Sequence, residues 1–243
     1  MHVRKVAAVC LSVVLLAVGG YTVATYIRDK DKQEVSVEML DTSAVFTSDD
    51  NDVAKMYDQK IIQEMIGKYN KVVGINSDII GWIKVLNSNI DYPICSGNNN
   101  FYLNRTYDKR PSKSGSIFLD ENQLTFDLVS IIHGHNMLNG TMFSHLKKFS
   151  DQEFFDKNNV LIYDGKEMRV FKPISFLRVK ETTTFKYNIT EREELVKYAK
   201  ELTQGSLTRT NKQITNDDVL ILNTCVSDGT GDHNILIAQE IFE

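Results

Sequence analysis

Residues 218–225 read Asp-Val-Leu-Ile-Leu-Asn-Thr-Cys, and the fold is predicted outward from this stretch. Four consecutive aliphatic residues at 219–222 indicate a strand that is buried on both faces. Cys225 stands where the strand leaves the core, and the turn-forming cluster 228–232 follows it. A cysteine in this position is either a small apolar residue that ends a strand or a nucleophile held at the mouth of the core. The rest of the sequence has to decide between these interpretations.

Short apolar runs recur along the chain and predict further strands. They cover residues 79–85, 90–95, 115–119, 126–132, 160–163, 168–179 and 235–241. Asp164-Gly165 is a hairpin turn signal between two of them. With 219–222 the runs make about eight closely spaced strands and few helices, which is typical of a closed or nearly closed β-barrel. We therefore predict a mainly β fold with an eight-stranded barrel.

Two longer helices and one short one are predicted beside the strands. Residues 53–73 carry apolar side chains at helical spacing, and Gly74 is expected to end this helix. An extra helix at 190–202 precedes the cysteine strand, with Thr190 as candidate N-cap and Glu193 completing a capping box. Residues 142–149 look like a short helix.

The N-terminal apolar segment decides the predicted compartment. Residues 6–27 follow Arg4 and Lys5 and are long enough, at about 1.5 Å per residue, to cross a bilayer about 30 Å thick. A retained membrane anchor and a cleaved signal peptide both fit; the length of the run favours the anchor. The predicted organisation is an anchor with its flanks at 1–32, a tether at 33–52, a helical segment at 53–78 and a β-barrel at 79–243.

Composition sets limits on the class of function. The chain has 243 residues, 42% hydrophobic and 25% charged, which is ordinary for a globular protein. The net charge of −4 lacks the excess of basic residues that is typical of nucleic-acid-binding proteins, so no nucleic-acid partner is predicted. Three cysteines do not make a disulfide framework, although a Cys95–Cys225 bridge is conceivable. Outside the cytoplasm, an unpaired Cys225 would be kept for its reactivity.

Two histidines follow the predicted strand 126–132. If the strand continued, His133 and His135 would point the same way and could bind a metal with Cys225 or His233. The lack of a dense carboxylate and histidine cluster, and a bend at Gly134, argue against this, so no metal and no cofactor are predicted. Alternatively His135 meets Cys225 at the barrel rim, where the imidazole exchanges a proton with the thiol and a leaving amine.

At these residues the sequence resembles the sortases, membrane-anchored cysteine transpeptidases of Gram-positive bacteria, and most closely class B. The resemblance lies in blocks that occur in order: residues 79–83 with 90–94, 100–103 with 114–120, Gly-His-Asn-Met at 134–137 with Gly-Thr-Met-Phe at 140–143, and Leu-Asn-Thr-Cys at 222–225. The N-terminal anchor, the helix after it and the helix 190–202, an insertion typical of class B, fit the same family.

The resemblance implies a function. Cys225 would attack a threonine carbonyl in the C-terminal sorting signal of a secreted protein, with an Asn-Pro-x-Thr-x signal expected, and His135 would protonate the departing amine. The thioester would pass to an amine on a peptidoglycan precursor or on a pilin, with Thr224 lining the site. The enzyme would lie in the cell membrane as a single-pass protein with its catalytic domain outside. The alternative is a weak sortase-like module that only binds or hydrolyses sorting signals.

Two positions depart from the family pattern. Asn223 replaces the usual serine before Thr224, and His233 stands where the family places an arginine at the start of the last strand. Arginine is always cationic, whereas histidine with a pKa near ~6.5 is mostly neutral at pH 7. Three outcomes are open: His233 substitutes and activity rises toward acid pH, Arg105 or Arg178 folds into the site, or turnover is weak.

Overall fold

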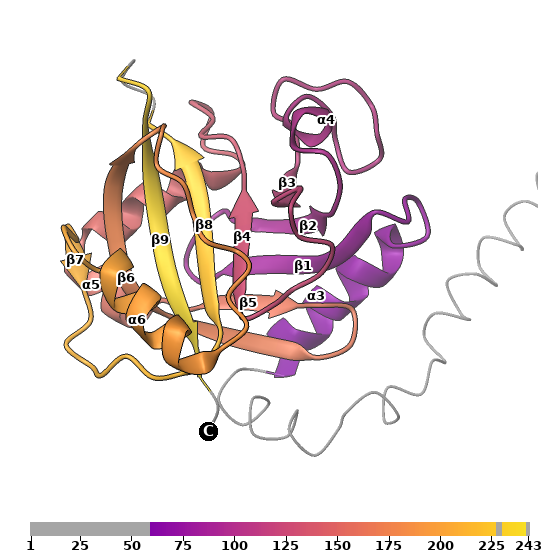
Figure 1. Ribbon diagram of the computed structural model, residues 1–243. Helices are drawn as coiled ribbons and strands as arrows, with labels where there is room; N and C mark the ends of the chain where they lie inside the picture. The colour runs from indigo at the N-terminus through magenta and orange to yellow at the C-terminus, as the bar shows by residue number, and fades with distance from the viewer. Residues whose placement is uncertain (1–58, 227–229, 242–243) are drawn as a thin grey trace, which may run out of the picture. The chain divides into compact units, whose positions relative to one another are not determined.

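The computed structural model describes residues 59–226 and 230–241, and their main feature is a closed β-barrel (Figure 1). Eight strands follow one another in the order β5-β1-β2-β3-β4-β8-β9-β6, and β6 pairs with β5 to close the barrel. The β2–β3 and β4–β8 pairs are parallel, and the other pairs are antiparallel. The predicted mainly β, eight-stranded barrel is therefore confirmed.

The strand bounds follow the predicted runs with shifts at their ends. They are β1 Ile79–Val85, β2 Asp91–Cys95, β3 Ile117–Leu119, β4 Val129–His133, β5 Val160–Tyr163, β6 Met168–Lys180, β7 Thr208–Arg209, β8 Val219–Cys225 and β9 Asp232–Glu240. The two-residue β7 pairs only with β6 and adds a short ninth strand outside the closed ring. The last strand begins earlier than its apolar run predicts, because residues 232–234 continue the pairing with β8 and β6.

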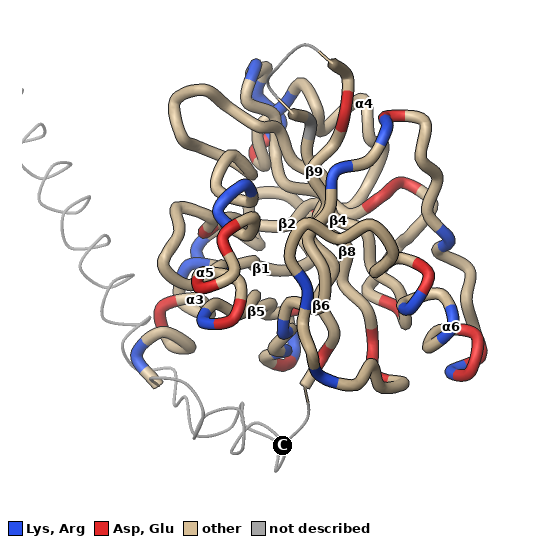
Figure 2. Tube along the Cα trace, turned by 90° about the vertical axis from the view of Figure 1, so that its left-hand side faces the viewer, with Lys and Arg blue, Asp and Glu red and all other residues tan. Residues whose placement is uncertain are grey.

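Helices cover parts of the barrel surface. They are α3 Gln59–Val72, α4 Asn99–Leu103, the 3₁₀ helix η2 Phe143–Ser150, α5 Gln152–Lys157 and α6 Arg192–Leu202. The helix α3 is the described part of the predicted helix 53–73, and α6 is the predicted extra helix before the cysteine strand. Figure 2 shows acidic and basic residues interspersed along α3 and α6 in that view.

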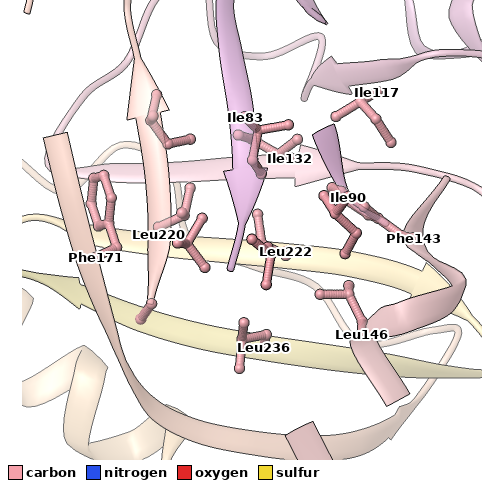
Figure 3. Close-up of a cluster of buried hydrophobic side chains, with 14 of the residues drawn as sticks. Ile83, Ile90, Ile117, Ile132, Phe143, Leu146, Phe171, Leu220, Leu222 and Leu236 are labelled. Atoms are coloured by element: carbon pink, nitrogen blue, oxygen red, sulfur yellow. The ribbon is translucent and has the colours of Figure 1, made fainter. Parts of the chain in front are cut away.

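Alternation along β8 places its side chains in two separate apolar cores. Leu220 and Leu222 point into the barrel interior, where they join a cluster from most of the strands and from η2 (Figure 3). Val219 and Ile221 point to the other face and pack, with Leu195 of α6, in a second cluster. Full burial of such a side chain stabilises the fold by about 1.5–3 kcal/mol. A strand buried on both faces is what the apolar run 219–222 predicts.

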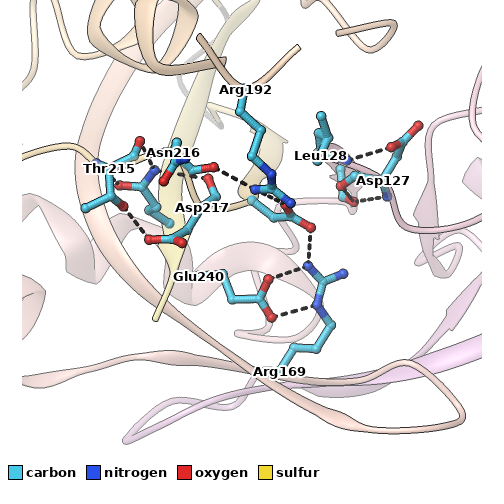
Figure 4. Close-up of polar contacts among 11 residues, drawn as sticks. Asp127, Leu128, Arg169, Arg192, Thr215, Asn216, Asp217 and Glu240 are labelled. Atoms are coloured by element: carbon cyan, nitrogen blue, oxygen red, sulfur yellow. Dashed lines mark hydrogen bonds and ion pairs between the residues drawn. The ribbon is translucent and has the colours of Figure 1, made fainter. Parts of the chain in front are cut away.

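A cluster of charges closes one end of β8 and β9 (Figure 4). Arg169 of β6 forms a fork on Glu240, at 2.8 and 2.6 Å, and also contacts Asp218 at 2.8 Å. Arg192 of α6 approaches the other oxygen of Asp218 at 3.1 Å. The buried carboxylate of Glu240 is thereby paired in the bidentate geometry that suits arginine.

Two local predictions are wrong. The helix α6 begins one residue later than expected, with Glu191 at the N-cap and no side-chain capping bond, so the capping box of Thr190 and Glu193 does not form. Ile189 is buried in the same cluster as Leu195, and this packing fixes how the chain enters the helix. The conceivable Cys95–Cys225 bridge does not form either: Cys95 is a free, buried thiol, and burial raises its pKa to about 12.

The N-terminal predictions lie outside the described residues. These are the apolar segment 6–27 and the tether 33–52, so the predicted domain boundaries remain predictions. Within residues 59–226 and 230–241, no helix has both the length and the apolar character of a membrane span.

Candidate active site

A cavity of about 260 Å³ lies where β4 and β8 end and β9 begins, at the opposite end of β8 from Asp218. Its lining comes from α4, which follows β2, from the segments after β4 and β6, and from strand residues: Asn99, Leu103, Phe118, His133, Gly134, His135, Glu181, Asn223, Thr224 and His233. Three of the four residues predicted for the site, His135, Thr224 and His233, therefore share one cavity.

His135 lies in the loop after β4, held by hydrogen bonds on both of its sides. The backbone N–H of Gly134 donates to the Asn223 carbonyl at 3.2 Å, and that of Phe143 donates to the His135 carbonyl at 2.9 Å. The ring nitrogen Nε2 lies 2.8 Å from the Leu103 carbonyl oxygen. A carbonyl only accepts, so Nε2 carries a hydrogen and Nδ1 is the nitrogen that can gain or lose the catalytic proton.

Gly134 is required by close packing. A Cβ atom at this position would lie 2.4 Å from Cδ1 of Ile117 and 2.9 Å from Cδ2 of Phe143, both buried core side chains. Only a residue without a side chain lets the backbone pass between them and place His135 at the cavity. The β4 strand ends at His133, so the alternation that would have aligned the two histidines does not continue.

Cys225 is the last residue of β8, and its backbone is paired with His233 of β9. The neighbouring Thr224 is 2% exposed, and its hydroxyl oxygen has no hydrogen-bond partner among the described residues. An unsatisfied buried hydroxyl costs about 1–3 kcal/mol, so a site that leaves one open suits a ligand that completes it.

His233 lines the cavity in the position predicted for the family arginine. Its Nδ1 lies 2.7 Å from the Oδ1 of Asn223. Burial lowers the pKa of His233 below its usual value; the carboxylates of Glu181 and Asp232 act in the opposite direction, while His133 acts with burial. The ring is therefore mainly neutral at neutral pH and becomes a cation in acid.

Neither candidate arginine lines this cavity. Arg105 donates to the Lys109 carbonyl at 3.1 Å and lies over the Phe101 ring. Arg178 donates to Asp232 at 2.9 Å and lines a different cavity of about 460 Å³. Of the three outcomes open from the sequence, this geometry argues against the one in which Arg105 or Arg178 folds into the site.

The site also contains partners that sequence reasoning missed. His133 bonds to other groups: its Nε2 lies 2.9 Å from Asp120, and its Nδ1 lies 3.1 Å from the Nδ2 of Asn223. The pairing of β4 with β8 places His133 opposite Asn223, and no local sequence signal reports this pairing. No group of three or more His, Cys, Asp or Glu side chains that could hold a metal occurs in residues 59–226 and 230–241.

Comparison with known proteins agrees with this arrangement. The sortase-domain family model matches residues 83–241. Sortase B of Listeria monocytogenes is 26% identical over 235 residues, covering 93% of this chain and 92% of the relative, and sortase B of Staphylococcus aureus is 28% identical over 223 residues, covering 88% and 86%. The crystal structure of Clostridium perfringens sortase B superposes with a TM-score of 0.65 at 33% identity, over 71% of this chain and 98% of that one. The chain therefore belongs to the sortase family and is of the sortase B type.

Proposed function

We propose that this protein is a cysteine transpeptidase acting on a sorting signal of a secreted protein. The observation that carries the proposal is the shared cavity: His135, Thr224 and His233 line it, next to the strand position of Cys225, in a chain of the sortase family. A sortase B from Staphylococcus aureus has been solved as a complex with its substrate.

In the proposed reaction the thiolate of Cys225 attacks the threonine carbonyl carbon and forms a carbon–sulfur bond. The carbon–nitrogen bond breaks, and His135 gives the departing nitrogen a proton from Nδ1, because Nε2 is bonded to the Leu103 carbonyl. An acceptor amine then attacks the thioester, loses a proton to His135 and releases the thiolate. The buried hydroxyl of Thr224 is available to bond the peptide, and a protonated His233 stabilises the oxyanion.

Three finer statements belong to the same proposal. The signal is of the Asn-Pro-x-Thr-x kind, and the acceptor is a peptidoglycan precursor or a pilin amine. Residues 6–27 hold the protein in the cell membrane, with the catalytic barrel on the outer side.

The test uses the full-length chain in detergent with a peptide that carries Asn-Pro-x-Thr-x, with and without a glycine peptide as acceptor. Mass spectrometry should detect a ligated product when the acceptor is present. Cleavage alone would favour a hydrolytic peptidase, and binding without turnover would favour a binding module. Turnover that survives in Cys225→Ala would refute the nucleophile.

A further inference from the structure

Four side chains from separate segments form one hydrogen-bonded chain that ends in the cavity. Asp120, after β3, lies 2.9 Å from Nε2 of His133, at the end of β4. The Nδ1 of His133 lies 3.1 Å from Nδ2 of Asn223 on β8, and Oδ1 of Asn223 lies 2.7 Å from Nδ1 of His233 on β9. The chain thus runs across three neighbouring strands to the residue paired with Cys225.

The chemistry of the groups fixes the direction of every bond. The hydrogen bond with His133 is the main reason that the pKa of Asp120 lies well below its usual range, so this carboxylate only accepts. The Nε2 of His133 therefore donates to it, and its Nδ1 accepts from the amide nitrogen of Asn223. That leaves the amide oxygen of Asn223 to accept from His233, whose hydrogen must lie on Nδ1.

This direction has a consequence for His233. A neutral imidazole carries one hydrogen, so with Nδ1–H fixed, Nε2 holds a lone pair. The ring can offer an Nε2–H donor only after it gains a second proton and becomes a cation. Among the described side chains, the titratable groups around it are His133 on β4, Glu181 after β6, Asp232 on β9 and His135 in the cavity lining. Asp232 is itself paired with Arg178 and Lys180.

We propose that Asp120, His133 and Asn223 are positioning residues that hold His233 as its Nδ1–H tautomer, so that His233 donates to the substrate oxyanion only as a cation. The inference rests on the proposed transpeptidase function. In this arrangement, the permanent charge of an arginine is replaced by a charge on His233 that depends on pH. Activity is then lost as pH rises through the pKa of His233.

The direct test is the tautomer in the full-length chain labelled with ¹⁵N-histidine. Imidazole nitrogens with and without a hydrogen resonate far apart, so the spectrum at neutral pH assigns the hydrogen on His233 to Nδ1 or Nε2. We expect Nδ1–H in the wild type. In Asn223→Ser, which removes the bridge, and in His133→Phe, which keeps a flat ring beside Phe118, we expect the hydrogen to move to Nε2. His145→Phe is the matched control. His145 is a half-buried histidine whose Nδ1 accepts from the backbone N–H of Asn89, and it takes no part in the hydrogen bonds from Asp120 to His233.

The second readout is the pH profile of kcat/KM for ligation. In Asn223→Ser and His133→Phe, the basic limb of the kcat/KM profile should move to higher pH. The maximal kcat/KM should fall about threefold to tenfold, because a neutral donor replaces a charged one. Thermal unfolding of each variant checks the fold, and Asn223→Ser decides alone if His133→Phe does not fold. Nε2–H in the wild type would overturn the proposal, as would variants with the wild-type tautomer or an unmoved basic limb. An inactive wild type would refute the proposed function and leave the tautomer result standing.

Discussion

The two ends of β8 and β9 carry polar clusters made of different residue types. At one end Arg169 is fixed between Glu240 and Asp218, in a cluster of charged groups that is mostly buried. At the other end His133 and His233 are joined through an amide, and the cluster opens onto a cavity. An arginine in bidentate contact with a carboxylate holds a strand end in one geometry, whereas imidazoles change their hydrogen bonding with pH near neutrality. We call the Arg169 end the stable end, because ion pairs hold it, and the His233 end the reactive end, because the proposed reaction would take place there. The two differ in that the charge of the reactive end depends on pH.

The largest effect is expected from breaking the stable end. Arg169→Met leaves two carboxylates without their main partner in a buried site, so the free energy of unfolding should fall by about 3–5 kcal/mol. Activity per folded molecule should not change, because the cavity lies at the other end of the strands. Urea unfolding at pH 7 measures the loss. The control Lys157→Met removes an exposed pair with Glu153 and should change stability by less than about 0.5 kcal/mol; equal losses in both variants would contradict the account.

The next effect concerns the loop that carries His135. Gly134→Ala forces a methyl group against Ile117 and Phe143, which should cost about 1–3 kcal/mol of stability. Displacement of the imidazole by about 1 Å should also lower kcat/KM by about 100-fold. Gly67→Ala in α3 is the matched control: its Cβ has nothing within 4 Å, so stability should rise by about 0.5–1 kcal/mol with unchanged activity. Equal kcat/KM in both variants would show that the packing of Gly134 does not position His135.

The smallest effect is expected at the reactive end and concerns the stability that Asp120 contributes. The pKa of Asp120 lies below its value in an unfolded chain, chiefly because of His133. A depressed carboxyl pKa stabilises the fold fully above the unfolded value of about 3.9, and this stability is lost as pH falls through the folded pKa. Asp120→Asn should therefore be about 1 kcal/mol less stable than wild type at pH 6, with the difference shrinking below about pH 4. Urea midpoints from pH 6 to pH 2 measure it, and parallel curves would contradict the prediction.

Much of the barrel could be predicted because its strands are continuous apolar runs. Residues 79–85 and 160–163 form strands with the predicted bounds, since burial on both faces leaves no other place for such runs. Strand ends could not be predicted where pairing, and not burial, extends them, as at residues 232–234. The start of α6 was missed because packing of Ile189 prevailed over the capping preference of Thr190.

The candidate site was predictable only in part. His135, Thr224 and His233 line one cavity, and the motifs that pointed to them are local in sequence. The hydrogen bonds from Asp120 to His233 join side chains of four segments, and no local sequence pattern predicts which strands will be neighbours. The replacement of the family's usual serine by Asn223 did not indicate its two hydrogen bonds, through which it connects His133 to His233.

The most direct test of the difference between the two ends is the pH profile of ligation for the wild type and His233→Arg. The full-length chains would be compared by kcat/KM from pH 5 to pH 9, with His145→Gln as the control. Arginine keeps its charge throughout this range. The wild type should lose activity on the basic side first, as His233 loses its proton, and His233→Arg should keep its activity to higher pH. Superimposable profiles would contradict the claim that His233 supplies the pH-dependent charge of the reactive end.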